Sequence, residues 1–300
     1  MQLTLSPFAR LKEKHIVGVF ERPSAAVEAA KKLPGFHHTA RSMRLDRAFY
    51  SDDWEGMERG AVEGSKAFAD RARALEKGIA GVQFATPKRV VKESPFGRPS
   101  VGAYLAGDPM PCRRVVTEKV DHAPLSIVVA LNTLWSVKQE TMEKRGTAIA
   151  ALVQTVAAQR PVNLYLSRFC EVSGVNSCFL VKFPTTPIDT YRLAYLLSSQ
   201  AFARGLFFAL HKSAQPLFAQ VGETVRDVST SDFIGPAGTA SYSQNRNCPF
   251  ADDLKDFLRT DLLYIPGAYP GIADYDKLRA DPVAWVNDTV AMLTKPKGKG

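Results

Sequence analysis

The pattern of apolar and polar positions changes near residue 115. Beyond that point, short apolar runs alternate with long helical periods. The run at 125–131 is apolar on both faces, which is typical of a central strand covered on each side. A polar loop at 132–136 follows, then a helical pattern from 138 to 158 and a second apolar run at 162–169. This order predicts a β-loop-α-β unit, in which the loop occupies the usual position of an α/β binding site.

The rest of the chain to residue 294 continues this alternation. It predicts an α/β core domain over 115–294, with three layers: a mostly parallel central sheet and helices on both faces. The tail at 295–300 is expected to be disordered. We predict further strands at 113–120 (an edge strand), 177–183 (an antiparallel edge strand), 205–210 and 261–265, and helices at 189–199 and 281–293.

Residues 1–114 predict a different kind of structure, a basic and partly helical N-terminal region that ends in a connector. Helical patterns occupy 25–33, a segment starting near Trp54, and 65–77. The proline-rich stretch at 85–99 argues against regular structure. We therefore expect residues 78–115 to form an extended arm or connector.

Charge adds to this picture because it is unevenly distributed. The chain has 39 Lys and Arg against 30 Asp and Glu, a net charge of +9. Residues 1–120 hold 21 basic and 14 acidic residues, whereas residues 121–300 hold 18 and 16. A basic excess of this kind often marks contact with phosphate backbones. The alternative is a solvated basic surface that only aids solubility.

The basic residues of the connector are interleaved with aromatic ones, the combination that single-strand binding proteins use to hold phosphates and stack bases. The alternative is a connector laid over the core, with its aromatic side chains buried. The candidate nucleic-acid-binding residues are Lys88, Arg89, Lys92, Phe96, Arg98, Tyr104, Arg113 and Arg114.

Enzymatic signatures are missing from the sequence. It contains no P-loop, no dinucleotide-binding glycines between Leu131 and Arg145, and no GxSxG nucleophile motif. The four cysteines form no CxxC pair, and the adjacent histidines His37 and His38 point apart on regular structure. We expect a protein that is not an enzyme and has no catalytic residues, no metal and no cofactor.

No apolar run reaches the roughly 18 residues that a membrane helix needs, and the N-terminus does not resemble a signal peptide. The sequence therefore predicts a cytoplasmic protein without a membrane partner.

The order of elements from 125 to 210 resembles a von Willebrand factor A domain. That family binds a divalent ion through an Asp-x-Ser-x-Ser loop after the first strand. In this chain the aspartate position falls on Asn132 and the serine positions on Leu134 and Ser136, and a later aspartate falls near His211. Asn132 lacks the charge that a hard cation requires, and Leu134 cannot be a ligand. The resemblance implies the fold with its metal-site motif lost.

A second resemblance is to an uncharacterised family of tailed-phage proteins. It rests on the segments at 100–109, 125–131, 143–148 and 189–194, of which Tyr-Leu-Ala-Gly-Asp-Pro at 104–109 is the most specific. The resemblance implies a phage-encoded protein in the cytoplasm of an infected bacterial host and assigns no catalytic residue.

Two functional hypotheses follow. The first is a non-enzymatic phage accessory protein that binds single-stranded DNA or RNA in replication or transcription. The second is a protein-interaction or self-assembling module with a degenerate von Willebrand A-like site. Its partner, a phage or host protein or another copy of the chain, would be contacted by Asn132, Trp135, Ser136 and the loop at 231–250.

Overall fold

The computed structural model describes most of the chain. The described residues are 3–4, 15–32, 36–79, 88–94, 98–110, 112–118, 124–133, 136–172, 175–210, 254, 258–268, 271 and 273–294.

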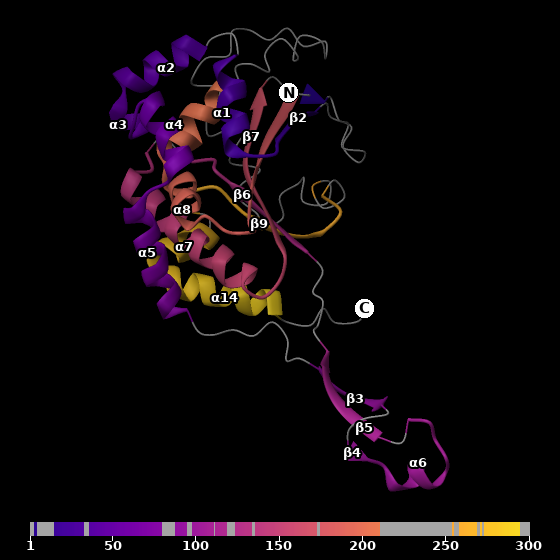
Figure 1. The fold of residues 1–300 in the computed structure, drawn as a ribbon. Helices are drawn as coiled ribbons and strands as arrows, with labels where there is room; N and C mark the ends of the chain where they lie inside the picture. Colours follow the sequence, from indigo (N-terminus) through magenta and orange to yellow (C-terminus); the bar gives the residue numbers. More distant parts are fainter. Residues whose placement is uncertain are drawn as a thin grey trace.

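The described strands form two separate sheets (Figure 1). The larger is a six-stranded mixed sheet in the order β1-β2-β8-β7-β6-β9. The pairs β2–β8, β7–β6 and β6–β9 are parallel, whereas β7–β8 and β1–β2 are antiparallel. The strands are β1 (Leu3–Thr4), β2 (His15–Phe20), β6 (Leu125–Ala130), β7 (Val162–Val172), β8 (Val175–Phe183) and β9 (Asp261–Ile265).

The predicted β-loop-α-β unit is confirmed. It consists of β6, α7 (Gln139–Ala157) and β7, with β6 and β7 parallel. The apolar stripe predicted on the helix is buried throughout. The antiparallel pairing of β8 with β7 is also confirmed, but its expected edge position is wrong, because β2 pairs with the other side of β8. The stripe consists of Met142, Ile149, Leu152, Val153 and Val156.

The membership of β2 also corrects the division of the chain at 114/115. Residues 15–20 are part of the core sheet, and the helices that follow them pack on it. The strand expected at 113–120 on the edge of the core sheet is wrong, because residues 112–118 form a strand of the second sheet instead. The N-terminal region is therefore not a separate unit before the core. Its helices are α1 (Pro23–Lys31), α2 (Phe36–Leu45), α3 (Arg47–Tyr50), α4 (Trp54–Glu63) and α5 (Lys66–Gly78).

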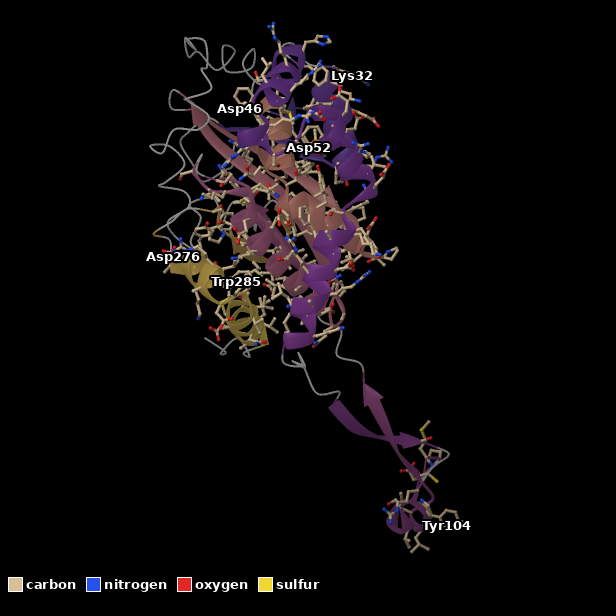
Figure 2. All side chains as sticks on the ribbon, turned by 90° about the vertical axis from the view of Figure 1, so that its left-hand side faces the viewer. Lys32, Asp46, Asp52, Tyr104, Asp276 and Trp285 are labelled. Atoms are coloured by element: carbon tan, nitrogen blue, oxygen red, sulfur yellow. The ribbon has the colours of Figure 1, made fainter. Side chains whose placement is uncertain are left out.

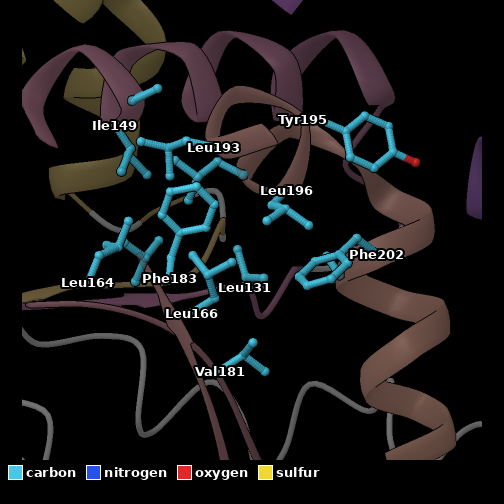
Figure 3. Close-up of a cluster of buried hydrophobic side chains, with 14 of the residues drawn as sticks. Leu131, Ile149, Leu164, Leu166, Val181, Phe183, Leu193, Tyr195, Leu196 and Phe202 are labelled. Atoms are coloured by element: carbon cyan, nitrogen blue, oxygen red, sulfur yellow. The ribbon is translucent and has the colours of Figure 1, made fainter. Parts of the chain in front are cut away.

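The main core lies between one face of the sheet and the helices. Alternate residues of β6 (Leu125, Ile127 and Val129) enter it, because successive residues of a strand point to opposite faces. Figure 3 shows side chains from the sheet, α7 and the following helices meeting in this layer. Further helices that contribute to this core are α8 (Thr190–Ser198), α13 (Ala273–Ala280) and α14 (Pro282–Thr294).

The opposite face of the sheet has a smaller cluster. It contains Val128, Ala130, Phe169 and Tyr264 from the strands, with Leu254 from outside them. In the described part of the chain, the helices from α1 to α14 that contribute to a hydrophobic cluster contribute to the main core. The predicted layer of helices on the opposite face of the sheet therefore stays a prediction.

The predicted strand at 205–210 is wrong. The π-helix η1 (Ala201–Leu206) and a helical continuation to Leu210 occupy this segment. Every residue from 201 to 210 is buried. A short run buried on all sides shows neither strand nor helix periodicity, so the pattern did not distinguish the two.

Helix α7 packs unusually closely on α8. At Gly146, an added Cβ would lie 2.7 Å from the backbone carbonyl carbon of Leu197 and would also overlap Ser198. Real Cβ atoms do not approach backbone this closely, so glycine is required where the two helices meet.

Helix α4 begins at a capping aspartate, and its first residue, Trp54, confirms the predicted start of this helix. The side chain of Asp53 accepts a hydrogen bond from the Gly56 amide at 2.9 Å and forms an ion pair with Arg47. The Gly56 hydrogen bond and the Arg47 charge lower the pKa of the Asp53 carboxyl from 3.8. The carboxylate form therefore stabilises the folded state.

In the described part of the chain, no single helix is long and apolar enough to span a membrane. The helices Thr190–Ser198 and Ala201–Leu210 meet the length and composition criteria only as a pair, bent by 67°.

Candidate nucleic-acid interface

The second sheet carries most of the predicted nucleic-acid-binding residues. It consists of β3 (Lys88–Ser94), β5 (Cys112–Glu118) and β4 (Arg98–Pro99), with β5 in the middle and both pairs antiparallel. Helix α6 (Val101–Leu105) lies between β4 and β5 in sequence. Figures 1 and 2 show this unit, which we call the arm, extending away from the six-stranded sheet and its helices. The expected irregular connector is thus an ordered β-arm.

The register of the arm places basic residues next to one another. Lys92 pairs directly with Arg114 across β3 and β5. Arg113, one residue earlier on the central strand, pairs with Arg98 on one side and Glu93 on the other. Like charges at directly opposed positions of a sheet are destabilising. The register of the arm contains two such positions.

The arm has more positive than negative charge along its length. Residues 88–118 include six Lys or Arg and three Asp or Glu. Two of the acids are matched: Glu118 pairs with Lys88, and Glu93 pairs with Arg113. The basic positions without a directly opposed acid are Arg89, Lys92, Arg98 and Arg114.

The arm shows no alternation between an apolar and a polar face. Val90 pairs with Val116, and Val91 pairs with Val115 at the next position. Because adjacent positions lie on opposite faces, each face carries one valine pair and neighbouring basic positions. A sheet that packed on the body would need one apolar face. By its register, the arm has no apolar face of that kind.

Helix α6 at the far end of the arm is exposed. Tyr104 is 71% exposed, and Figure 2 shows it at the tip. Arg98 is also exposed. Phe96, the other aromatic candidate, lies outside the described residues.

The loop after β6 has a structural role. Asn132 is buried, and its amide nitrogen donates to the Phe169 carbonyl at 2.7 Å. Its amide oxygen accepts a hydrogen bond from the Phe169 backbone N–H at 3.1 Å. Asn132 thus joins this loop to β7, which corrects its expected position on a contact surface. Ser136 is exposed, whereas Trp135 and the loop at 231–250 lie outside the described residues.

Buried arginines without a signature in the sequence lie near the carboxyl end of β6 and along β7. Arg145 on α7 donates to the carbonyls of Ala130 and Pro266, at 2.9 and 2.6 Å. It therefore joins α7 to the ends of β6 and β9. Arg168 on β7 donates to the Ala203 carbonyl in η1 at 2.6 Å.

Arg204 in η1 lies close enough to Arg168 for their charges to interact. Its guanidinium donates to Gln200 Oε1 at 3.1 Å and to the Val137 carbonyl at 3.2 Å. Burial, followed by the charge of Arg168, lowers the pKa of Arg204 to about 10. Arg204 therefore stays protonated at neutral pH, and these arginines hold η1 and the loop before α7 against the sheet.

Among the described residues, no group of three or more His, Cys, Asp or Glu side chains is arranged to hold a metal ion.

Comparison with known proteins gives one match. A family model described as "Domain of unknown function (DUF7192)" matches residues 10–255. No curated protein and no solved structure matches the chain.

Proposed function

Because the matched segment covers most of the chain, the protein belongs to the DUF7192 family. The description of that family names no activity, so we propose the function from the structure of the arm. We propose that it is a non-enzymatic accessory protein that binds single-stranded DNA or RNA through the arm. The carrying observation is the direct opposition of Lys92 to Arg114, beside the opposition of Arg98 to Arg113.

A polyanion accounts for these like-charged pairs. In the free protein they repel one another, and phosphate groups bound beside them replace that repulsion with attraction. Each phosphate contact also releases condensed counterions, which favours binding at low salt. Tyr104, exposed beyond the basic strands, offers a ring on which a base can stack.

The context we propose is phage replication or transcription in the cytoplasm of an infected bacterium. Its support is the resemblance of residues 100–109 to a tailed-phage family, and these residues lie at the tip of the arm. We also retain a von Willebrand A-like core as a proposal. The order β8-β7-β6-β9 with an antiparallel β8 supports it, whereas the helical segment at 201–210 departs from it.

Titration of labelled single-stranded DNA and RNA with the full chain, at several salt concentrations, tests the proposal. We expect binding that weakens linearly on a log–log plot as salt rises. Absence of binding to both ligands at low salt would contradict it.

A further inference from the structure

The tip of the arm, residues 100–110, is apolar and exposed. Val101 is 71% exposed, Tyr104 71%, Leu105 79% and Met110 47%. The five residues of α6 include no charged side chain, and none of them is buried. A helix that is apolar all round is normally buried, in a protein core or in a membrane. Phosphate binding by the strands does not require such a tip.

Charge is almost absent from the tip. Asp108 is the only charged residue from 100 to 110. It follows α6, and its Oδ1 accepts a hydrogen bond from the Met110 amide at 2.8 Å, which stabilises the turn back toward β5. Ionised side chains resist transfer into an apolar medium, and α6 contains none. The helix therefore suits contact with an apolar medium rather than with a charged surface.

Basic residues follow immediately behind the tip. Strands β4 and β5 end at the tip with the pair Pro99 and Cys112, and the two like-charged pairs of the arm occupy the next two positions of β5. A strand rises about 3.4 Å per residue, so both basic pairs lie within about 7 Å of the tip. The headgroup layer of a bilayer is roughly 5–8 Å thick on each side of the hydrocarbon core. The two pairs therefore lie within one headgroup layer when the tip reaches the hydrocarbon boundary.

We infer that the tip inserts into the surface of an anionic lipid bilayer, whose headgroups the basic pairs bind. Val101 and Leu105 enter the boundary of the acyl chains, and Tyr104 lies at the interface, where an aromatic ring with a hydroxyl is favourable. A protein partner would cover one face of α6, whereas a bilayer surrounds it on every side. The arm extends away from the body (Figure 2), so the tip can reach a flat surface.

Insertion of this kind differs from spanning a membrane. The expectation of no membrane partner rested on the length of the apolar runs, which concerns spanning helices only. A short apolar segment with basic residues behind it binds one leaflet, by apolar burial and by attraction to anionic lipids. The inference goes beyond nucleic-acid binding and does not depend on it. Both ligands use the basic strands, so an oligonucleotide and a vesicle should compete for the arm.

Flotation of the nuclease-treated full chain with lipid vesicles tests the inference. One set of vesicles contains equal amounts of phosphatidylglycerol and phosphatidylcholine, and the other contains phosphatidylcholine alone. We expect the wild type to bind the anionic vesicles, by roughly fivefold more tightly for each basic residue at the surface. Leu105→Asp should weaken this binding by roughly tenfold or more, because it removes a buried leucine from the contact. Leu45→Asp on α2 is the matched control, because Leu45 is 74% exposed and lies away from the arm.

Fluorescence locates the tip in the bilayer. Leu105→Trp should add an emission, measured as the difference from the wild type, that shifts to shorter wavelength on binding. Lipids with brominated acyl chains should quench this emission. Leu45→Trp should show neither change. Val101→Asp repeats the loss-of-binding test if Leu105→Asp does not fold, as judged by circular dichroism.

Three results would overturn the inference: a wild type that binds neither vesicle or both equally, tip and control variants that bind alike, or a Leu105→Trp emission that brominated lipids do not quench. Nucleic-acid titrations of the same variants separate the two proposals. Leu105→Asp should bind nucleic acid as the wild type does, because it leaves the basic strands intact. A protein that binds vesicles and no oligonucleotide would contradict only the proposed function, and the reverse result would contradict only this inference.

Discussion

Replacement of the opposed pair Lys92 and Arg114 by alanine should reduce the salt dependence of nucleic-acid binding without unfolding the body. The two positions face each other across β3 and β5, in an arm that lies away from the main core. Their loss removes two phosphate contacts and also removes a like-charge repulsion. The arm should therefore remain folded while its affinity for nucleic acid falls.

The register sets the magnitude. Four basic positions of the arm have no directly opposed acid, so we count four phosphate contacts in the wild type. At about 0.7 per contact for single strands, the slope of log K against log salt is about −2.8. The double variant retains two contacts and should show a slope of about −1.4. A rise from about 50 to about 200 mM salt then weakens the wild type about 50-fold and the variant about 7-fold.

Fluorescence anisotropy with a labelled oligonucleotide measures both slopes. The matched control is Lys66→Ala with Lys77→Ala, which removes the same charge from exposed positions on α5. Its slope should equal that of the wild type. An equal reduction in the control would show that only net charge matters, and an unchanged slope in the arm variant would refute the assignment of these contacts.

Three predictions concern the body and are measured by urea unfolding. Asn132→Ala should lower the free energy of unfolding by about 2–4 kcal/mol, because it removes both hydrogen bonds to the buried backbone of Phe169. The control Ser136→Ala should change it by less than about 0.5 kcal/mol. Equal effects of the two substitutions would contradict the structural role of Asn132. Gly146→Ala should cost about 1–3 kcal/mol by overpacking α7 on α8. Gly78→Ala on α5 is the control, because its added Cβ would meet only Val283 at 3.7 Å, and it should change the free energy of unfolding by less than about 1 kcal/mol. A stabilised Gly146→Ala would refute the close contact. Asp53→Ala should cost about 1 kcal/mol near neutral pH. Because the folded pKa of Asp53 lies below 3.8, that contribution is fully present above about pH 4 and shrinks as the pH falls from 3.8 through the folded pKa. A difference that grows as the pH is lowered from neutral would contradict the capping account.

The central β-loop-α-β unit was predictable because its signals are local. The continuous apolar run of β6 and the stripe of α7 each indicate one element, and their order implies parallel strands. The place of β2 was not predictable in the same way. It pairs with β8, about 160 residues later in the chain. A short run of strand-forming residues indicates a strand but does not indicate its pairing partner.

The strands of the arm have a sequence pattern, but the neighbouring prolines argued against regular structure there. The strings Arg-Val-Val at 89–91 and 114–116 are identical, and the structure pairs their valines. Pro95 and Pro99 suggested irregular chain, although proline is compatible with the ends of short strands. The basic residues could be predicted as a group, but their opposition depends on register, which composition does not contain.

The buried arginines show a related limit. Arg145 lies at helical spacing from Met142 and Ile149 and is buried with them, but a charged residue beside an apolar stripe did not indicate a core position. Its partners are backbone carbonyls, and these have no signature in the sequence. Asn132 was misjudged for the same reason, because both of its hydrogen bonds are to the backbone of Phe169.

Photocrosslinking tests the central claim most directly, because it locates the bound strand on the full protein. A single-stranded oligonucleotide with photoreactive bases is bound at low salt and irradiated, and the crosslinked peptides are identified by mass spectrometry. We predict crosslinks within 88–118, with Tyr104 among the modified residues. Crosslinks confined to the body, with none in the arm, would contradict the account.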